Sequence, residues 1–246
     1  MSIERERFGS GFVPPWVVRE HDERYRHAAT FVHQRKVLDC ACGAGFGARS
    51  FLAEGPTALV AVDVSQEAVR QTLERAPGAA ILRGSATSLP IASGTLDLAI
   101  SLETMEHVED DAAYLAEISR VLSPSGIFVC STPNRAVTNP GASLAHRPFN
   151  RFHVREYSQG EFQALLAERF GEVEILGQTP CPRWRVGAMA GLGRLFGPRI
   201  AARIAQALKL PRFLWDQPGR YAVRPQDPRV CYEYLVAVCR APRSPA

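Results

Sequence analysis

Short apolar runs alternate with helix-like stretches along the first half of the chain. Five of these runs have the length and composition of buried strands, and they span residues 36–41, 58–64, 79–84, 95–102 and 126–134. Helical connections between successive strands place those strands parallel in one sheet. The alternation therefore predicts an α/β protein with a doubly wound sheet that is covered by helices.

The second half of the chain continues this pattern and interrupts it once. Ser158 and Glu161 stand at capping-box spacing at the start of a helical stretch, and strands are expected at 171–179 and 230–239. Residues 180–228, between these strands, are rich in Pro, Gly and Arg and indicate an insertion. We expect a single domain over 1–246 with a mostly parallel seven-stranded sheet. An N-terminal cover helix within 1–34 and a helical insertion before the last strand complete the expected fold.

The composition is that of a soluble globular protein, with 46% hydrophobic and 22% charged residues among 246. No apolar run approaches the roughly 20 residues that a membrane helix needs, and the N-terminal residues lack the apolar core of a signal peptide. The six cysteines do not form the paired motifs of a zinc site. We therefore expect a cytoplasmic protein with reduced cysteines and no integral membrane contact.

The net charge of +4 is unevenly distributed. Residues 181–246 carry twelve Lys or Arg and three Asp or Glu, whereas residues 1–180 carry seventeen and twenty-two. This basic C-terminal part predicts an anionic partner or substrate near that end. Because aromatic residues are not interleaved with these charges, we expect no nucleic-acid partner.

The segment VLDCACGAGFGA, residues 37–48, has the form of a strand, a glycine-rich turn and a helix N-terminus. Glycines there let a ligand approach the backbone, and Asp63 at the end of the next strand suits ribose hydroxyls. The glycines alone would also fit a dinucleotide. Asp39 distinguishes the two ligands, because its carboxylate would repel a pyrophosphate but would suit an ammonium and a sulfonium. S-adenosylmethionine (SAM) carries both.

With this turn, the acidic end of LVAVDVS, and the segments GSATSLPIASGTLDLAIS and ISRVLSPSGIFVCSTPN, the chain resembles the class I SAM-dependent methyltransferases. The resemblance covers nearly the whole chain outside 180–228 and implies their Rossmann-like fold. It also implies that the first turn holds the methionine half of SAM, that Asp63 holds the ribose and that the segment after the third strand covers the adenine. The implied cofactor-binding residues are Asp39, Ala41, Gly43, Gly45, Asp63, Val64, Ser85, Ala86, Thr87 and Leu102.

Two positions depart from the family pattern. Ser85 stands where the family usually has the Asp that binds the adenine amino group. This change leaves the Ala86 N–H and the Ser85 hydroxyl for adenine. Ala41 stands where many relatives have Gly.

The stretch LETMEHVED, residues 102–110, spaces Glu103, Glu106 and His107 three and four residues apart. On a helix this spacing places the three side chains on one face. They can be an ordinary solvated helix start. They can also line the crevice at the carboxyl ends of the strands, where open α/β sheets bind ligands. A further histidine, His153 in NRFHVREYS, favours the second interpretation.

Glu-x-x-Glu-His followed by a distant His resembles the metal-binding pattern of small-RNA 2′-O-methyltransferases and quinone-biosynthesis O-methyltransferases. The resemblance implies that Glu103, Glu106, His107 and His153 hold a divalent ion, for which Mg²⁺, Mn²⁺ and Zn²⁺ are all chemically suitable. Such an ion lowers the pKa of a hydroxyl and positions it for methyl transfer. Without an ion, His107 or His153 is the expected general base, with Glu106 as the third catalytic residue.

The N-terminal segment and STPNR…NRFHVREYSQGEF resemble bacterial methyltransferases of polysaccharide and glycosylated-metabolite pathways. The expected substrate contacts are Trp16, His21, Arg24, Tyr25 and Asn134. We expect the insertion to be a lid whose charge comes from Arg194, Arg199, Arg203 and Lys209. Arginines there would suit the pyrophosphate of a nucleotide- or lipid-linked sugar. The alternative, a helix lying on lipid headgroups, is disfavoured by Pro198 and the nearby glycines.

The sequence therefore predicts a SAM-dependent O-methyltransferase that acts on a hydroxyl of a sugar, glycan or glycosylated natural product. Methylation of a catechol, phenol or quinone precursor remains open, as does N-methylation of an amino sugar. Two other classes are a non-catalytic SAM-binding protein and an NAD-dependent oxidoreductase. Asp39 and the absence of a Tyr-x-x-x-Lys pair disfavour the oxidoreductase. A homodimer is compatible with the sequence.

Overall fold

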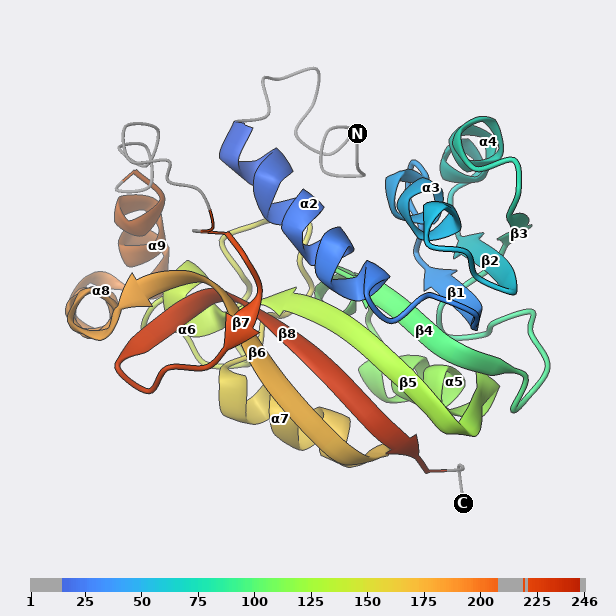
Figure 1. Ribbon diagram of the computed structural model, residues 1–246. Coiled ribbons are helices and arrows are strands. Elements are labelled where there is room, and N and C mark those ends of the chain that lie inside the picture. The colour runs from blue at the N-terminus through green and yellow to red at the C-terminus, as the bar shows by residue number, and fades with distance from the viewer. Residues whose placement is uncertain (1–14, 208–218, 220, 244–246) are drawn as a thin grey trace.

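The computed structural model describes residues 15–207, 219 and 221–243, and an eight-stranded sheet forms the centre of this part of the chain (Figure 1). Its strands are β1 (Lys36–Cys40), β2 (Ala58–Asp63), β3 (Ala80–Arg83), β4 (Leu96–Leu102), β5 (Leu122–Pro133), β6 (Phe170–Pro182), β7 (Arg224–Pro225) and β8 (Val230–Pro242). Across the sheet they follow the order β3-β2-β1-β4-β5-β8-β6-β7.

The strands β1 to β5 are mutually parallel, and β8 runs antiparallel between β5 and β6. This arrangement confirms the predicted doubly wound, mostly parallel sheet. The sheet has one strand more than predicted, because the two residues of β7 pair with β6 at the edge. A strand of two residues is too short to show an alternating sequence pattern. Its pairing depends on where the tertiary structure brings it next to β6.

Helices cover both faces of the sheet. The helices α2 (Pro15–Ala29), α3 (Phe46–Ala53) and α4 (Gln66–Arg75) lie on one face, and α5 (Asp111–Val121) and α7 (Gln159–Ala167) lie on the other (Figure 1). Successive residues of a strand point to opposite faces. In β4, Leu98 and Ile100 therefore pack with α2 and α3, whereas Ala99 packs with α5 and α7. Leu96 joins Ala99 because the strand is irregular between Leu96 and Leu98.

Local capping places several helix ends where the sequence predicts them. The Ser65 hydroxyl accepts a hydrogen bond from the Ala68 N–H at the start of α4. The predicted capping box is present at α7, where the Ser158 side chain accepts from the Glu161 N–H and Glu161 accepts from the Ser158 N–H. These bonds satisfy backbone N–H groups that a helix start leaves without partners.

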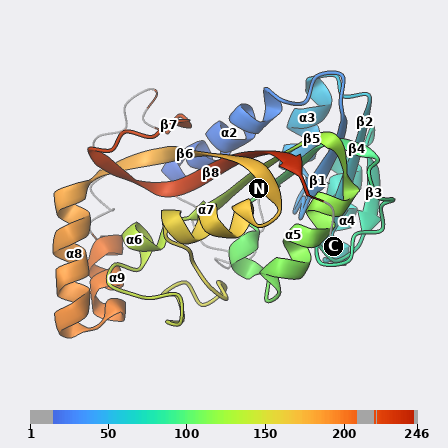
Figure 2. The same cartoon turned by 90° about the horizontal axis from the view of Figure 1, so that it is seen from below.

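The insertion before β8 is helical, as expected. It contains α8 (Arg183–Phe196) and α9 (Pro198–Ala207), which lie next to α6 (Arg135–Thr138) beyond the end of β6 (Figure 2). Lys209 lies outside the described residues, as do the first fourteen residues of the expected cover region. Among the helices that are described, none is both long enough and apolar enough to cross a membrane.

Candidate active site

A cavity of about 690 Å³ lies at the carboxyl ends of β1, β2 and β4. Open α/β sheets bind their ligands at this edge. Eight of the ten predicted cofactor residues line it, namely Ala41, Gly43, Asp63, Val64, Ser85, Ala86, Thr87 and Leu102. Glu103, His107 and His153 line the same cavity, and so do Tyr25 and His21 of α2. Most of the predicted cofactor residues and the two predicted catalytic histidines therefore share one cavity.

The turn after β1 brings backbone to the cavity through left-handed conformations. Gly43 has φ of 55°, and Gly45, which precedes α3, has φ of 80°. A Cβ on Gly45 would lie 2.8 Å from the Thr72 Cα, so a larger residue does not fit there. Ala41 has φ of 59° and is strained, because its Cβ disfavours this region. This conformation gives a physical reason for the Gly that many relatives have at this position.

Asp63 is held at the cavity wall by two backbone donors. The Gly43 N–H donates to its Oδ2 and the Ser65 N–H donates to its Oδ1, both at 2.9 Å. Nearby, the Ser85 hydroxyl lies 2.8 Å from the Thr87 hydroxyl and accepts from the Thr87 N–H at 3.2 Å. The Ser85 hydroxyl, which was expected to face adenine, is thus bonded within its own turn.

Asp39 lies directly behind the glycine-rich turn rather than on the cavity surface. It is 5% exposed, and its Oδ2 has no hydrogen-bond partner among the residues that the structure describes. A Cβ on Gly47 would lie 3.1 Å from this oxygen and 2.7 Å from the Tyr25 ring. Because Gly47 has no Cβ, the Asp39 carboxylate and the Tyr25 ring can both pack against its backbone. Burial and the neighbouring Asp63 carboxylate raise the pKa of Asp39 to about 7. A buried carboxylate with an open oxygen fits a cationic ligand, and SAM is one.

The chain turns sharply where β4 ends, and this turn separates the residues of LETMEHVED. Glu103 has φ of 53°, and only Met105–His107 form a short 3₁₀ helix, η1. The single helical face expected for Glu103, Glu106 and His107 is therefore not formed. The Ser131 hydroxyl donates to Glu103 Oε1 at 2.7 Å, and the same oxygen lies 3.9 Å from Arg24 Nε.

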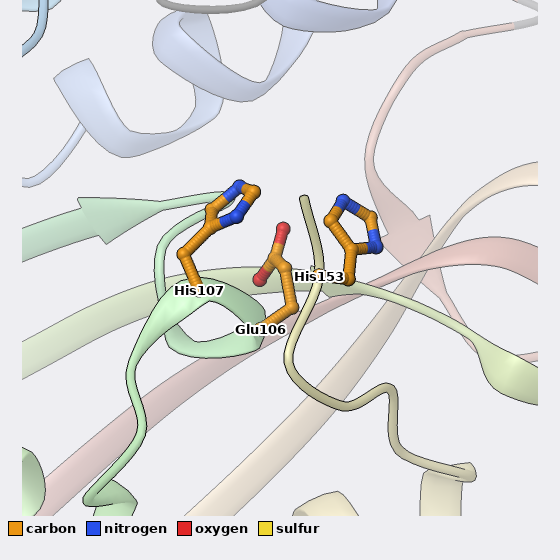
Figure 3. A group of neighbouring side chains, drawn as sticks. All are labelled: Glu106, His107 and His153. Atoms are coloured by element: carbon orange, nitrogen blue, oxygen red, sulfur yellow. The ribbon is translucent and has the colours of Figure 1, made fainter. Parts of the chain in front are cut away.

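Glu106, His107 and His153 converge at the cavity wall, which His107 and His153 line and behind which Glu106 is buried. One potential ligand atom from each residue lies within 4.8 Å of the others, and the Glu106 carboxylate lies between the two imidazole rings (Figure 3). Glu106 is 1% exposed, its Oε2 accepts from the Thr132 hydroxyl, and its Oε1 has no hydrogen-bond partner within the described part of the chain. Burial and the Glu103 carboxylate raise its pKa well above the usual range.

Both imidazoles of this cluster are oriented by neighbouring acceptors. His107 Nδ1 lies 2.9 Å from the Phe152 carbonyl oxygen. His153 Nδ1 lies 2.6 Å from Glu156 Oε1, and its Nε2 lies 2.8 Å from Asn150 Nδ2. Metal-binding histidines are commonly oriented in this way by a carboxylate or a carbonyl. A cation bound to His153 would replace one of its two present hydrogen bonds.

Glu156 is the carboxylate that orients His153, and other residues keep it ionised. It is 2% exposed and accepts hydrogen bonds from Thr138 and Asn139 as well as from His153. Although burial alone would raise the pKa of Glu156, these hydrogen bonds and the His153 ring lower it. An ionised carboxylate at this distance fixes the tautomer and the orientation of the imidazole, as it does for many metal-binding histidines.

Some predicted site residues have other contacts in the structure. Glu103 lines the cavity but does not belong to the group of Glu106, His107 and His153. Arg24 is buried, donates to Gln178 Oε1 at 2.5 Å and lies over the Tyr234 ring. Asn134 caps α6 and donates to the Tyr232 carbonyl, and neither it nor Trp16 lines the cavity. Gly45 does not line it either.

Several cavity residues were not predicted. Phe46 follows the glycine-rich turn, and Asn150 and Phe152 immediately precede His153. Thr104, Glu109 and Asp110 complete the acidic and polar wall next to His107. Their closeness in sequence to predicted residues was the available signal, because chain neighbours of a site residue commonly line the same wall.

Comparisons with known proteins agree with this geometry. A family model described as a methyltransferase domain matches residues 38–130. The chain is 33% identical over 199 residues to a probable S-adenosylmethionine-dependent methyltransferase of Mycobacterium tuberculosis, covering 80% of this chain and 71% of that protein. A phthiotriol/phenolphthiotriol dimycocerosates methyltransferase of the same species is 30% identical over 161 residues, which are 62% of this chain and 57% of that protein.

A solved structure shares the fold. A SAM-dependent methyltransferase of Thermotoga maritima, described as a possible histamine N-methyltransferase, aligns over 92% of each chain with a TM-score of 0.62 and 15% identity. This likeness confirms the predicted Rossmann-like fold.

Proposed function

The chain belongs to the SAM-dependent methyltransferases, and from this premise we propose that it methylates a hydroxyl oxygen of a sugar, glycan or glycosylated natural product. We further propose that a divalent cation, held by Glu106, His107 and His153, assists the transfer. The observation that carries the proposal is the convergence of these three side chains, because His107 and His153 line the cavity that also contains the cofactor residues and Glu106 lies buried between their rings (Figure 3).

The donor set fits a cation on physical grounds. Glu106 Oε1 is a buried oxygen to which no described residue donates a hydrogen bond. Isolated buried carboxylates are costly unless they are protonated or bound to a cation. When bound, a divalent cation lowers the pKa of a hydroxyl that it contacts. The orientation of His107 by the Phe152 carbonyl and of His153 by Glu156 supports the same role for the two rings.

The proposed reaction is an in-line displacement at the methyl carbon. The acceptor oxygen forms a bond to that carbon, the carbon–sulfur bond breaks, and the products are the methyl ether, S-adenosylhomocysteine and a proton. Asp39 would compensate the positive charge of the cofactor, and Asp63 would accept from the ribose hydroxyls. The proton would leave to solvent, because Glu156 and the cation would occupy the two nitrogens of the His153 ring.

The wall around the cluster supports a hydroxyl-rich acceptor. Glu103, Glu109, Asp110 and Asn150 line this part of the cavity and offer oxygen acceptors to hydroxyl groups. Phe152 and Tyr25 supply rings against which a sugar face could pack. The triols in the name of the phthiotriol methyltransferase agree with an acceptor that carries hydroxyl groups.

The proposal predicts that methyl transfer depends on a divalent cation. With methyl-labelled SAM and sugar-containing extracts as acceptors, EDTA is expected to abolish label transfer, and added Mg²⁺, Mn²⁺ or Zn²⁺ to restore it. His107→Ala is expected to lower transfer by about a hundredfold or more, because one ligand and its orientation are lost. SAM binding, measured by calorimetry, should change little. The matched control is His33→Ala, since His33 is exposed and bonds only to the Glu54 carbonyl.

Transfer that is unaffected by EDTA but lost in His153→Ala would reject the cation. It would then assign His153, oriented by Glu156, as a metal-free general base. Label that appears only in acceptors without a sugar would reject the proposed acceptor class.

A further inference from the structure

A second concave surface, the arginine groove, lies outside the cofactor cavity. It has a volume of about 420 Å³ and is formed by the segment before His153 and by α9. Four of its seven lining residues are arginines, namely Arg147, Arg151, Arg199 and Arg203. Phe149 and Ile200, both exposed, lie among them. In Figure 2, α9 lies beside α6, which ends 60 residues before α9 begins, and beside the segment that follows α6.

The groove concentrates positive charge without a compensating negative charge. No acidic residue lines it, and none of its four guanidinium groups has an ion-pair partner among the described residues. Arg199 and Arg203 stand four residues apart on α9, a spacing at which like charges repel. By contrast, Arg155, in the same segment of chain, is paired with Asp111 at 2.7 Å. The Arg151 guanidinium lies over the Phe152 ring, 4.7 Å from its centroid, which leaves its charge uncompensated. Four arginines without an ion-pair partner among the described residues favour an anion with several oxygens.

The groove and the active-site cavity share one segment of chain. Arg147, Phe149 and Arg151 line the groove, whereas Asn150, Phe152 and His153 line the cavity. The two hollows therefore lie on either side of residues 147–153. An acceptor that extends past this segment could place its reacting hydroxyl in the cavity and an anionic group in the groove.

We propose that the arginine groove binds a phosphate or pyrophosphate group of the acceptor, so that the enzyme methylates a phosphorylated or pyrophosphate-linked substrate. Guanidinium groups bind phosphoryl oxygens in pairs of parallel hydrogen bonds, and a pyrophosphate offers enough oxygens for several arginines. This inference rests on the proposed function for the reacting hydroxyl, but anion binding itself does not require methyl transfer.

The first experiment measures binding of inorganic pyrophosphate to the full chain by calorimetry. S-adenosylhomocysteine is present to fill the cofactor site, and EDTA is present so that no cation bridges the anion. Binding to the parent protein is expected, with an affinity that falls by about tenfold or more in the double variant Arg199→Ala/Arg203→Ala. The matched control is Arg194→Ala, which removes an exposed arginine of the same insertion that does not line the groove.

Equal affinity in the parent and the double variant would overturn the proposal. An equal loss in the Arg194→Ala protein would also overturn it, because the anion would then sense only the general charge of the surface. Both substitutions replace exposed side chains, and circular dichroism checks that the variants remain folded. As a second measurement, phosphate-carrying and phosphate-free forms of the same sugar acceptor are compared. The double variant is expected to raise KM for the first form alone.

Two further ligands separate the sources of the phosphoryl group. Binding of uridine diphosphate that is tighter than binding of pyrophosphate, and that is lost in the double variant, supports a nucleotide-linked acceptor. Sedimentation with vesicles that contain phosphatidic acid, again lost in the double variant but retained in Arg194→Ala, supports a lipid-linked acceptor. Pyrophosphate binding without methylation of any sugar would reject the proposed function but would support the groove as an anion-binding site. Methylation of a sugar without pyrophosphate binding would reject the proposal that the arginine groove binds an anion.

Discussion

Asp39 shows how one buried carboxylate can select the charge of a ligand. Its pKa is raised to about 7 by burial and by Asp63, so without a ligand it is largely protonated below that pH. A sulfonium and an ammonium nearby would favour the ionised form. Cofactor binding and proton release are therefore coupled at this residue.

This coupling predicts that SAM affinity depends on pH. Affinity is expected to be highest above about pH 7 and to fall by about tenfold for each pH unit below it, because Asp39 must lose a proton on binding. In the absence of SAM, the stability of the fold has the opposite pH dependence. The folded state then holds a proton that the unfolded state has lost, so stability falls as the pH rises from about 4 to 7.

The measurement is calorimetric SAM titration across this pH range with the parent and with Asp39→Asn. The variant is expected to bind more weakly and to lose the pH dependence. Asp97→Asn is the control, because Asp97 accepts from the Lys36 N–H at the opposite end of β1 and β4. An unchanged pH dependence in Asp39→Asn would assign the titration to another group.

At the scale of elements, buried polar contacts hold the cover helix α2 against the sheet. Gln178 of β6 accepts from Arg24 and donates to the carbonyls of Glu20 and Tyr221. The Thr179 hydroxyl donates to Glu20 Oε1. These contacts orient the helix face that carries His21 and Tyr25 into the cavity. Arg24 thus acts through the position of α2, rather than by lining the substrate space.

The capping box of α7 makes a second element-scale prediction. Ser158→Ala removes the side chain that accepts from the Glu161 N–H, and it is expected to lower the free energy of unfolding by about 1 kcal/mol. α7 contributes Phe162 and Leu166 to the core, so the loss should appear in global denaturant unfolding. Ser50→Ala, at an exposed position inside α3, should instead be neutral or slightly stabilising. Equal losses in both variants would contradict a specific cap.

At the scale of the whole molecule, the strand order gathers the site from distant parts of the chain. β1 lies between β2 and β4, so the residues after all three strands meet at one edge of the sheet. The segment before α7 then brings His153 to His107, with ring centroids 4.9 Å apart. The cavity therefore exists only in the folded chain, and a ligand that fills it should stabilise the whole fold.

Ligand binding accordingly predicts a thermal shift. SAM at about 100 times its Kd is expected to add about 2.7 kcal/mol of stability and to raise Tm by about 5 to 10 °C for a chain of this size. NAD at the same concentration is expected to have little effect, because Asp39 would face its pyrophosphate. The measurement is calorimetric unfolding with each ligand. An equal shift with NAD would contradict the role assigned to Asp39.

The sequence alone predicted every strand except β7, the capped helices and most of the cofactor residues. Each of these depends on residues that are close together in the chain. β4 is recognised from its apolar run, Ser65 from its place before α4, and Asp63 from its place at the end of β2. Hydrophobic periodicity, capping and strand-end position act over a few residues, so a linear pattern contains them.

Only the tertiary structure decided how the side chains of these elements meet. The positive φ of Glu103 turns its carboxylate to Ser131 and Arg24, away from the cluster that its spacing suggested. Arg147 and Arg151 join Arg199 and Arg203 only because α9 packs near the segment before His153. The partners of Glu103 depend on the sharp turn after β4. The partners of the groove arginines depend on the packing of segments that are tens of residues apart in the chain. Hydrophobic periodicity contains neither kind of information. It indicates which face of a helix or strand is apolar, but it does not indicate which other element packs against that face.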